Sequence, residues 1–242
     1  MTLMSTIIAR SKSMRLKTSL SILLMTSACL FAQPKIRDVR NAAGNLNPGL
    51  PGYGIAPGSL ISIAGSTSSD AQTAAFPLTS NLNGLSVKIS VGGQDVDALI
   101  VSITSSNVLA LVPSTTPTGT GTVKVTDANG SASSPITIVD RNFGIFTQKG
   151  SSSNVGAGYA VNLIDGGNTP NTLTAPAMPG QQVAILGSGA GATTQDETNA
   201  VSAESLSGDF TLYIGGQPAT IVSSGRSGLG IDSLSLPAEI PI

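Results

Sequence analysis

The strongest constraint on this chain is that it contains the same pattern twice. Three segments recur in the same order, and the offsets between their copies are 122, 123 and, at the shared proline of the third pair, 124 residues. The pairs are Ala56–Ser66 with Met178–Ser188, Val91–Gln94 with Ile214–Gln217, and Leu109–Pro113 with Leu234–Pro237. Collinear self-similarity of this kind indicates two copies of one structural unit. We therefore expect two repeats, the first over residues 36–140 and the second over residues 143–242.

Alternation and turn residues predict that both repeats are built from β-strands. Residues 85–91 read Leu-Ser-Val-Lys-Ile-Ser-Val, which places apolar and polar side chains on opposite faces of a strand. Gly92-Gly93 then turns the chain into a further strand expected at Val96–Ile103. Aromatic residues make up only 3% of the chain, so Val, Ile, Leu and Ala must build the cores. This pattern predicts an all-β fold of two tandem immunoglobulin-like β-sandwiches.

The second sandwich is expected to lack its last two strands. In the first repeat, Thr122–Thr126 and Pro135–Val139 are predicted to form a closing hairpin that covers Leu109 and Leu111. Nothing in the second repeat corresponds to this hairpin. We therefore expect the strand near Ile231–Leu236 to be an unpaired edge, which could accept a strand from a partner.

The first 32 residues have the pattern of a signal peptide. A basic segment precedes the apolar run Thr18–Phe31, which is too short to cross a bilayer comfortably. Ala32 precedes the cleavage expected before Gln33, and the alternative is an uncleaved anchor. The single cysteine, Cys29, lies in a weak match to a lipoprotein acylation site, and cleavage before Gln33 removes the only thiol. We expect export to the extracellular space or cell surface, with no membrane span after cleavage.

Charge argues against nucleic acid as a partner. All 13 acidic residues but only 8 of the 12 basic residues follow residue 32, so the mature chain has a net charge of −5. Binding to a phosphate backbone needs clustered Lys and Arg, and no basic stripe occurs. The partners expected instead are an extracellular protein or a polysaccharide.

Several motifs resemble a known family in their order and spacing. Ala56–Gly65 and the Val-Gly-Gly turn at residues 91–93 are similar to the IPT/TIG-type modules of secreted acidobacterial proteins. Phe143–Thr147 and Gly187–Gly191 resemble the uncharacterised C-terminal domain of the same proteins. The resemblance covers about residues 36–242. It implies an immunoglobulin-like fold, export and no known activity, and in that family a final strand pair follows the Leu-Pro segment.

Residues 183–192 resemble the phosphate-binding fingerprint of dinucleotide-binding proteins. An apolar strand leads into a G-x-G-x-x-A motif that begins at Gly187, and Asp209 lies at a suitable distance to bind a ribose. The fingerprint also requires a helix that opens at the glycines, and Thr193–Asn199 has no apolar stripe to form one. We therefore expect a glycine-rich exit from a strand, and no cofactor.

The residue types needed for nucleophilic catalysis are missing. The chain has no His and no cysteine after residue 32, so a Ser-His or Cys-His pair cannot form in the mature protein. Ser188 lacks the G-x-S-x-G spacing because Leu186 stands at the first glycine position. A Ser-Lys dyad would need a lysine from a strand surface or loop, namely Lys35, Lys88, Lys124 or Lys149. The sequence therefore predicts that the protein is not an enzyme.

Metal or sugar binding would depend on a few surface side chains. Asp95 and Asp97 share one face of a strand and are weak candidates for Ca²⁺, which prefers oxygen ligands. Two further loop pairs are Asp127 with Asn129 and Asp165 with Asn168. Solvated turn residues are the simpler interpretation, so we expect no metal site. Sugar-binding modules commonly use exposed aromatic rings, and Tyr213 is the candidate for an outer face.

These patterns predict a secreted, non-enzymatic structural or adhesive protein of the cell surface or extracellular matrix. Phe143 and Phe146 are expected to pack between the two repeats. Two alternatives stay open: a polysaccharide-binding module, and a truncated C-terminal fragment of a larger exported protein.

Overall fold

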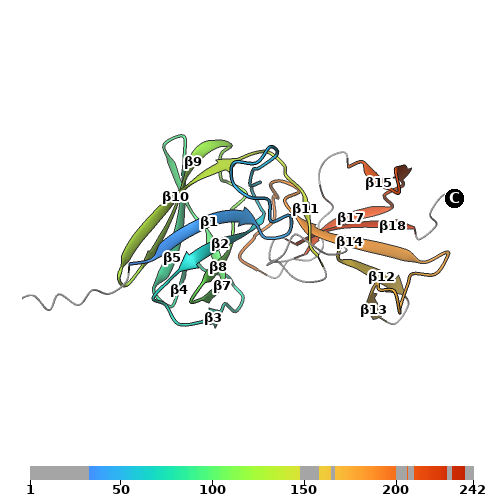
Figure 1. The fold of residues 1–242 in the computed structure, drawn as a ribbon, viewed down its shortest axis with the longest axis horizontal. Coiled ribbons are helices and arrows are strands. Elements are labelled where there is room, and N and C mark those ends of the chain that lie inside the picture. Colours follow the sequence, from blue (N-terminus) through green and yellow to red (C-terminus); the bar gives the residue numbers. More distant parts are fainter. Residues whose placement is uncertain are drawn as a thin grey trace, which may run out of the picture. The chain divides into compact units, whose positions relative to one another are not determined.

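The computed structural model describes residues 33–147, 158–164, 167–199, 206, 210–227 and 231–237. These residues form strands and turns without a helix, and the strands pair in antiparallel ladders (Figure 1). The all-β prediction is therefore confirmed, whereas the immunoglobulin-like identity stays a prediction. From Gln33 onward the chain forms one compact unit. The expected signal peptide, with Cys29, lies outside the described residues.

The first repeat contains two antiparallel sheets. One has the order β1-β2-β8-β7-β3, and the other has the order β10-β9-β5-β4 with β6 also paired to β5. The strands are β1 Lys35–Asn41, β2 Leu60–Ser66, β3 Gln72–Thr73, β4 Asn81–Leu82, β5 Leu85–Val91, β6 Gln94–Asp97, β7 Leu99–Thr104, β8 Asn107–Leu111, β9 Gly119–Asp127 and β10 Gly130–Ile138.

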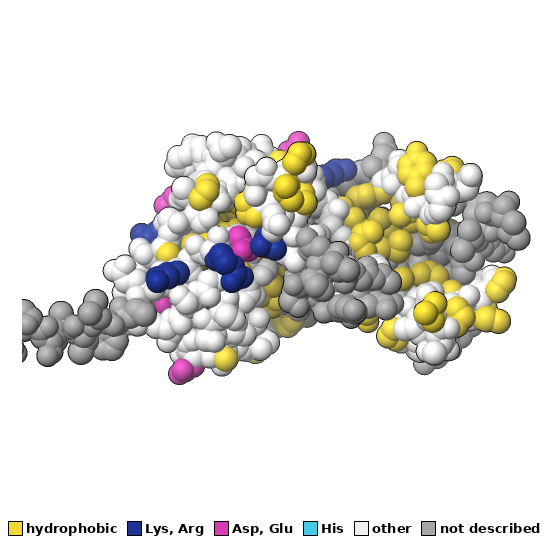
Figure 2. Space-filling view, in the orientation of Figure 1, with side chains coloured by type: hydrophobic (Ala, Val, Ile, Leu, Met, Phe, Trp, Pro, Cys, Tyr) yellow, Lys and Arg dark blue, Asp and Glu magenta, His cyan; other side chains and the backbone are white. Residues whose placement is uncertain are grey.

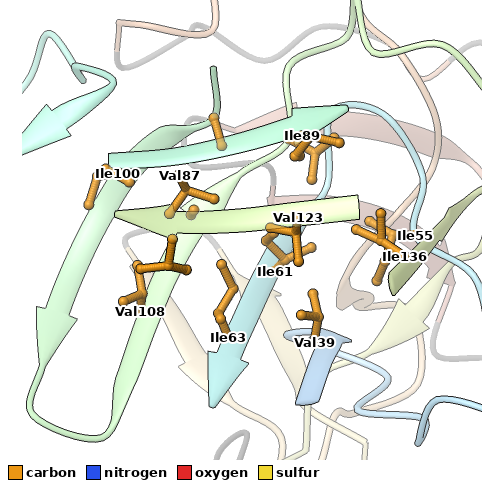
Figure 3. Close-up of a cluster of buried hydrophobic side chains, with 14 of the residues drawn as sticks. Val39, Ile55, Ile61, Ile63, Val87, Ile89, Ile100, Val108, Val123 and Ile136 are labelled. Carbon is orange, nitrogen blue, oxygen red and sulfur yellow. The ribbon is translucent and has the colours of Figure 1, made fainter. Parts of the chain in front are cut away.

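Strand β5 shows how the predicted alternation builds the core. Its four apolar side chains, from Leu85 to Val91, are at most 2% exposed, while the Ser and Lys residues between them are half-buried. They join side chains from β2, β8, β9 and β10 in one apolar cluster (Figure 3). Complete burial of one such side chain contributes about 1.5–3 kcal/mol. This cluster is therefore the main source of stability in the first repeat.

The closing hairpin β9–β10 covers different residues from those expected. Strand β9 pairs with β5, in the sheet that does not contain β8. The residues of β8 in the cluster of Figure 3 are Val108 and Ala110, whereas Leu109 and Leu111 pack in a second apolar cluster. The prediction for Leu109 and Leu111 is therefore wrong, because successive side chains of a strand point to opposite faces.

The strand expected at Val96–Ile103 is two strands in different sheets. Strand β6 pairs with β5, whereas β7 pairs with β8 and β3. The chain changes sheet at Ala98, which is fully buried and whose N–H donates to the carbonyl of Val87 at 2.9 Å. Periodicity alone did not predict this crossing, because the apolar run continues through it.

The second repeat contains a six-stranded sheet and a two-stranded one. The larger has the order β13-β12-β14-β18-β17, with β11 also paired to β14, and the smaller consists of β15 and β16. The strands are β11 Gly144–Ile145, β12 Ala160–Ile164, β13 Gly167–Pro170, β14 Gln182–Ser188, β15 Leu212–Ile214, β16 Gln217–Ala219, β17 Ser223–Ser227 and β18 Ile231–Pro237. By sequence and pairing, β14 matches β2, β15–β16 matches β5–β6, and β17–β18 matches β7–β8.

The edge strand predicted at Ile231–Leu236 is wrong. Strand β18 covers these residues and lies between β14 and β17, so both of its edges are paired. The error follows from the position of the first repeat's hairpin, which extends the sheet of β5 rather than the sheet of β8. Within the described part of the second repeat, β15 pairs with β16 alone, whereas its counterpart β5 is paired on both edges.

The first strand of the repeat is continuous in one copy and divided in the other. Strand β1 has a β-bulge between Ile36 and Asp38 where it pairs with β2. In the second repeat, β11 and β12 both pair with β14, and Thr147 bridges Gly158 between them. The division therefore falls at the position of the bulge, where the ladder is already interrupted and extra residues cost little pairing.

Candidate functional site at the junction of the repeats

Two buried polar side chains join the ends of β1 and β14. The Nδ2 of Asn41 donates to the carbonyl of Ser188 at 2.9 Å and to that of Asn142 at 3.2 Å. The Oγ of Ser188 accepts a hydrogen bond from the N–H of Leu60 at 2.9 Å. Asn41 is 5% exposed and Ser188 is fully buried. Ser188 thus links the repeats and has no access to a substrate.

The second repeat has an asparagine at the position of Asn41. Asn41 pairs with Ile61 in β2, and Asn162 pairs with Val183, the residue of β14 that matches Ile61. Asn162 is also buried, and its Nδ2 donates to the carbonyl of Ala175 at 2.9 Å. We did not predict this pair from the sequence, because the flanking residues differ and only the shared Asn marks it.

A buried ion pair binds residues that closely follow Ser188. The Nε of Arg226 donates to Oδ1 of Asp232 at 2.6 Å, and the side chains are 7% and 0% exposed. Oδ2 of Asp232 accepts from the N–H of Ala190, and Nη2 of Arg226 donates to the carbonyl of Gly191 at 2.7 Å. These extra hydrogen bonds matter because a buried ion pair alone does not offset its desolvation. Nothing in the sequence singled out this Arg and Asp.

Glycine is required where Arg226 meets the first repeat. A Cβ on Gly58 would lie 2.5 Å from Nη1 of Arg226 and 2.8 Å from the carbonyl oxygen of Gly191. Gly58 also has a φ of 72°, in the left-handed region that favours glycine. This Nη1 is buried and makes no hydrogen bond within the described part of the chain.

A carboxylate from the second repeat binds a serine of the first. Glu197 accepts hydrogen bonds from the N–H and the Oγ of Ser114, both at 2.8 Å, and the N–H of Thr193 donates to the same Oγ. Burial raises the pKa of the Glu197 carboxyl, although the Ser114 hydrogen bonds and the charge of Arg226 act in the opposite direction. Burial therefore favours the protonated form of Glu197 at the junction.

The G-x-G-x-x-A segment is part of this junction. A Cβ on Gly189 would collide with the carbonyl oxygen of Asn142 and approach Nδ2 of Asn41 to 2.8 Å, and one on Gly187 would collide with Phe143. Residues 189–199 form no helix. The segment is therefore the glycine-rich strand exit that we expected, and its glycines permit close packing instead of forming a phosphate cradle. Asp209 lies outside the described residues.

The calcium candidates hold a lysine between them. The Nζ of Lys88 lies 3.4 Å from Oδ1 of Asp97 and 3.6 Å from Oδ2 of Asp95, and Ser90 donates to Asp95 at 2.6 Å. Asp97 raises the pKa of Lys88, and the Ser90 hydrogen bond lowers the pKa of Asp95. The Lys88 side chain is 43% exposed, and those of Asp95 and Asp97 are more exposed still. The described residues contain no group of three or more His, Cys, Asp or Glu that could hold a metal.

Asp127 organises its own loop. Its carboxylate accepts from the N–H of Ser68 and from that of Asn129, each at 2.9 Å. Burial acts to raise the pKa of Asp127, but these N–H donors outweigh it and the pKa is lowered. The other predicted loop pair is only partly described, because Asp165 lies outside the described residues.

The aromatic side chains divide between surface and packing roles. Tyr213 is 64% exposed, as predicted, whereas the hydroxyl of Tyr53 donates to the carbonyl of Val39 at 2.9 Å. Phe146 packs against the second apolar cluster of the first repeat, so its expected packing between the repeats is found. Phe143 instead makes an edge contact with Phe210, with ring centroids 6.4 Å apart. Lys149 lies outside the described residues.

Comparisons with protein families, with curated proteins and with solved structures find no match to this chain. Among the residues that the structure describes, no helix is long and apolar enough to span a membrane.

Proposed function

We propose that this chain is a secreted, non-enzymatic structural or adhesive protein of the cell surface or extracellular matrix. The observation that carries this proposal is the junction, where buried polar side chains bind one another and the backbone across the two repeats. Asn41 and Ser188 are at most 5% exposed and hydrogen-bond across the two repeats, so they hold modules together rather than face a substrate. The export pattern, the lack of His and the IPT/TIG resemblance support the same role.

The adhesive role can be tested in cells that produce the protein. Deleting the gene should reduce attachment to a surface or incorporation of matrix, and expressing the wild-type chain should restore it. A Gly58→Ala chain should restore it poorly, because its Cβ displaces Arg226 at the junction. Gly84→Ala is the matched control, since Gly84 has a φ of 77° and no atom within 4 Å of the added Cβ. Normal attachment after deletion would refute the adhesive role.

Polysaccharide binding is the second candidate, because Tyr213 offers an exposed ring. Purified protein would be incubated with insoluble polysaccharides and the bound fraction measured. Binding that Tyr213→Ala abolishes and Phe76→Ala leaves intact would favour this candidate, since Phe76 is a second exposed aromatic at 42%. Binding that is unaffected by both changes, or no binding, would exclude the aromatic mode.

Export is testable by the intact mass of the protein outside the cell. We expect a chain that begins at Gln33, after removal of the basic and apolar segment. A diacylated chain that begins at Cys29 would replace this with the lipoprotein alternative. A mass that includes residue 1 would indicate the uncleaved anchor.

A further inference from the structure

We infer that the free edge of β15 accepts an uncharged β-strand from a different protein, not from a second copy of this chain, in the place that β9 occupies beside β5. The first repeat provides the template: β5 pairs with β6 on one edge and with β9 on the other. The second repeat keeps the pairing of β15 with β16, and no other described strand pairs with β15. This inference goes beyond the proposed adhesive role and does not depend on it.

The backbone of β15–β16 leaves one edge open and blocks the other. Ile214 and Gln217 flank the two-residue turn Gly215-Gly216, and Tyr213 pairs with Pro218. In a two-residue hairpin the pair next to the turn exchanges hydrogen bonds, so the N–H and C=O of Tyr213 point away from β16. Pro218 also faces outward but has no N–H, which makes the outer edge of β16 a poor acceptor. The open groups therefore lie on the β15 side.

The apolar side chains of β14 that match those in the cluster with β9 are only partly covered. In the first repeat, Ile61 and Ile63 of β2 are at most 3% exposed within the cluster that includes Val123 and Val125 of β9. Their counterparts in β14, Val183 and Ile185, are only half-buried. Figure 2 shows hydrophobic side chains gathered on the face of the second repeat, over β14 to β18. A strand with two inward apolar residues would cover this surface as β9 does.

The charge pattern defines the chemistry of the incoming strand. In the first repeat Lys88 faces Lys124 of β9 and forms ion pairs with Asp95 and Asp97, and the charge of Lys124 also acts to lower the pKa of Asp95. The matching residues of the second repeat are neutral, with Thr211 for Lys88, Pro218 for Asp95 and Thr220 for Asp97. A lysine at the position of Lys124 would lack a carboxylate there. The fitting strand therefore alternates inward β-branched apolar residues with outward neutral ones.

A peptide with the sequence of residues 119–126 and the change Lys124→Thr, which has no charged side chain, is the probe, tested on the full chain. By the alternation of β9, the N–H groups at positions 122 and 124 face β5, and those at 123 and 125 face β10. N-methylation at 122 and 124 should weaken binding at least about tenfold, which corresponds to about 1.4 kcal/mol. The isomeric peptide methylated at 123 and 125 should bind like the parent. The peptide that retains Lys124 should bind more weakly.

Hydrogen exchange at Tyr213 locates the bound strand. Its amide should exchange freely in the free chain and become protected when the parent peptide binds. Three results would overturn the inference: equal effects of the two methylated peptides, protection of Tyr213 in the peptide-free monomer, or a concentration-dependent dimer that protects Tyr213. The second result would show that this chain already covers the edge, and the third that a second copy does. None of these three results bears on attachment of the producing cells. The inference can therefore fail while the proposed function stands.

Discussion

The two repeats use matching strands but bury their apolar side chains to different degrees. In the first, one cluster brings together 18 buried residues, including every apolar side chain of β5. In the described part of the second, the buried hydrophobic residues are Ala184, Ala190 and Leu234, and Leu212 and Ile214 of β15 are half-buried. The hairpin β9–β10 covers one side of the first core, and no described strand of the second repeat takes its place beside β15. Matching strands therefore do not make a closed core unless the second sheet is wide enough to cover it.

The largest expected effect is a difference in independent folding. Residues 36–140 expressed alone should unfold cooperatively as a monomer, because their core and sheets are self-contained. Residues 143–242 alone should be unfolded or should oligomerise, since the few buried apolar residues in the described part of this half cannot offset the chain entropy of folding. Thermal unfolding and size-exclusion chromatography of each half measure this. A monomeric second half with a cooperative transition would show that its open core suffices.

Much of the first repeat was predictable from local pattern. The alternation in residues 85–91 and the Gly92-Gly93 turn predicted β5 and its return strand, because one face of that strand is buried and the other is not. The change of sheet at Ala98 was not predictable, since apolar residues run through it without a turn residue. The sequence also predicted the closing hairpin from its turn and alternation. These local features do not indicate which distant strand the hairpin joins, so its sheet was not predicted.

The junction was the least predictable part of the molecule. Its contacts join residues as far apart as Asn41 and Ser188, and no local spacing marks such a pair. The glycines from Gly187 were visible as a motif, but their role depends on what packs against them. Arg226 and Asp232 carried no signal at all, because two opposite charges six positions apart are an ordinary feature of a sequence.

Matched core substitutions in the two repeats should lower the free energy of unfolding by different amounts. Ile89→Ala removes a side chain that is 0% exposed and should lower the free energy of unfolding by about 2–5 kcal/mol. Leu212→Ala removes its half-buried counterpart and should cost about 1 kcal/mol, because less apolar surface is lost. Denaturant unfolding of the full chain measures both values. Equal losses would mean that β15 is as well covered as β5.

Substitution of two glycines should separate backbone strain from contact at the junction. Gly84→Ala should cost about 1–2 kcal/mol, because its φ of 77° is unfavourable for alanine and its surroundings are open. Gly58→Ala carries the same strain and also displaces Arg226, and losing a buried charge partner costs about 3–5 kcal/mol. Denaturant unfolding of both variants provides the comparison. Similar losses in the two variants would show that the junction relaxes around the new methyl group.

The smallest expected effect is an opposite response of the two regions to pH. Burial raises the pKa of Glu197 above its ordinary value of 4.5, so the folded junction binds its proton more tightly than the unfolded chain does. Its contribution is greatest below the unfolded pKa and is lost as the pH rises through the folded pKa. The N–H donors to Asp127 outweigh burial and lower its pKa below 3.8. That contribution is present above the unfolded pKa and is lost as the pH falls through the folded pKa.

Neutral variants isolate these two responses. The loss of stability caused by Asp127→Asn should shrink as the pH falls below about 4, because the wild-type carboxylate is then protonated as well. The free energy of unfolding of Glu197→Gln should rise relative to that of wild type as the pH rises above about 4, because only the wild-type chain must then bury a charge. Unfolding free energies measured across this pH range give both slopes. The total change in free energy for each variant should be smaller than the loss caused by Gly58→Ala. A slope of zero for Glu197 would show that the junction solvates its carboxylate as freely as the unfolded chain does, and slopes of the same sign would show that the folded junction lowers its pKa.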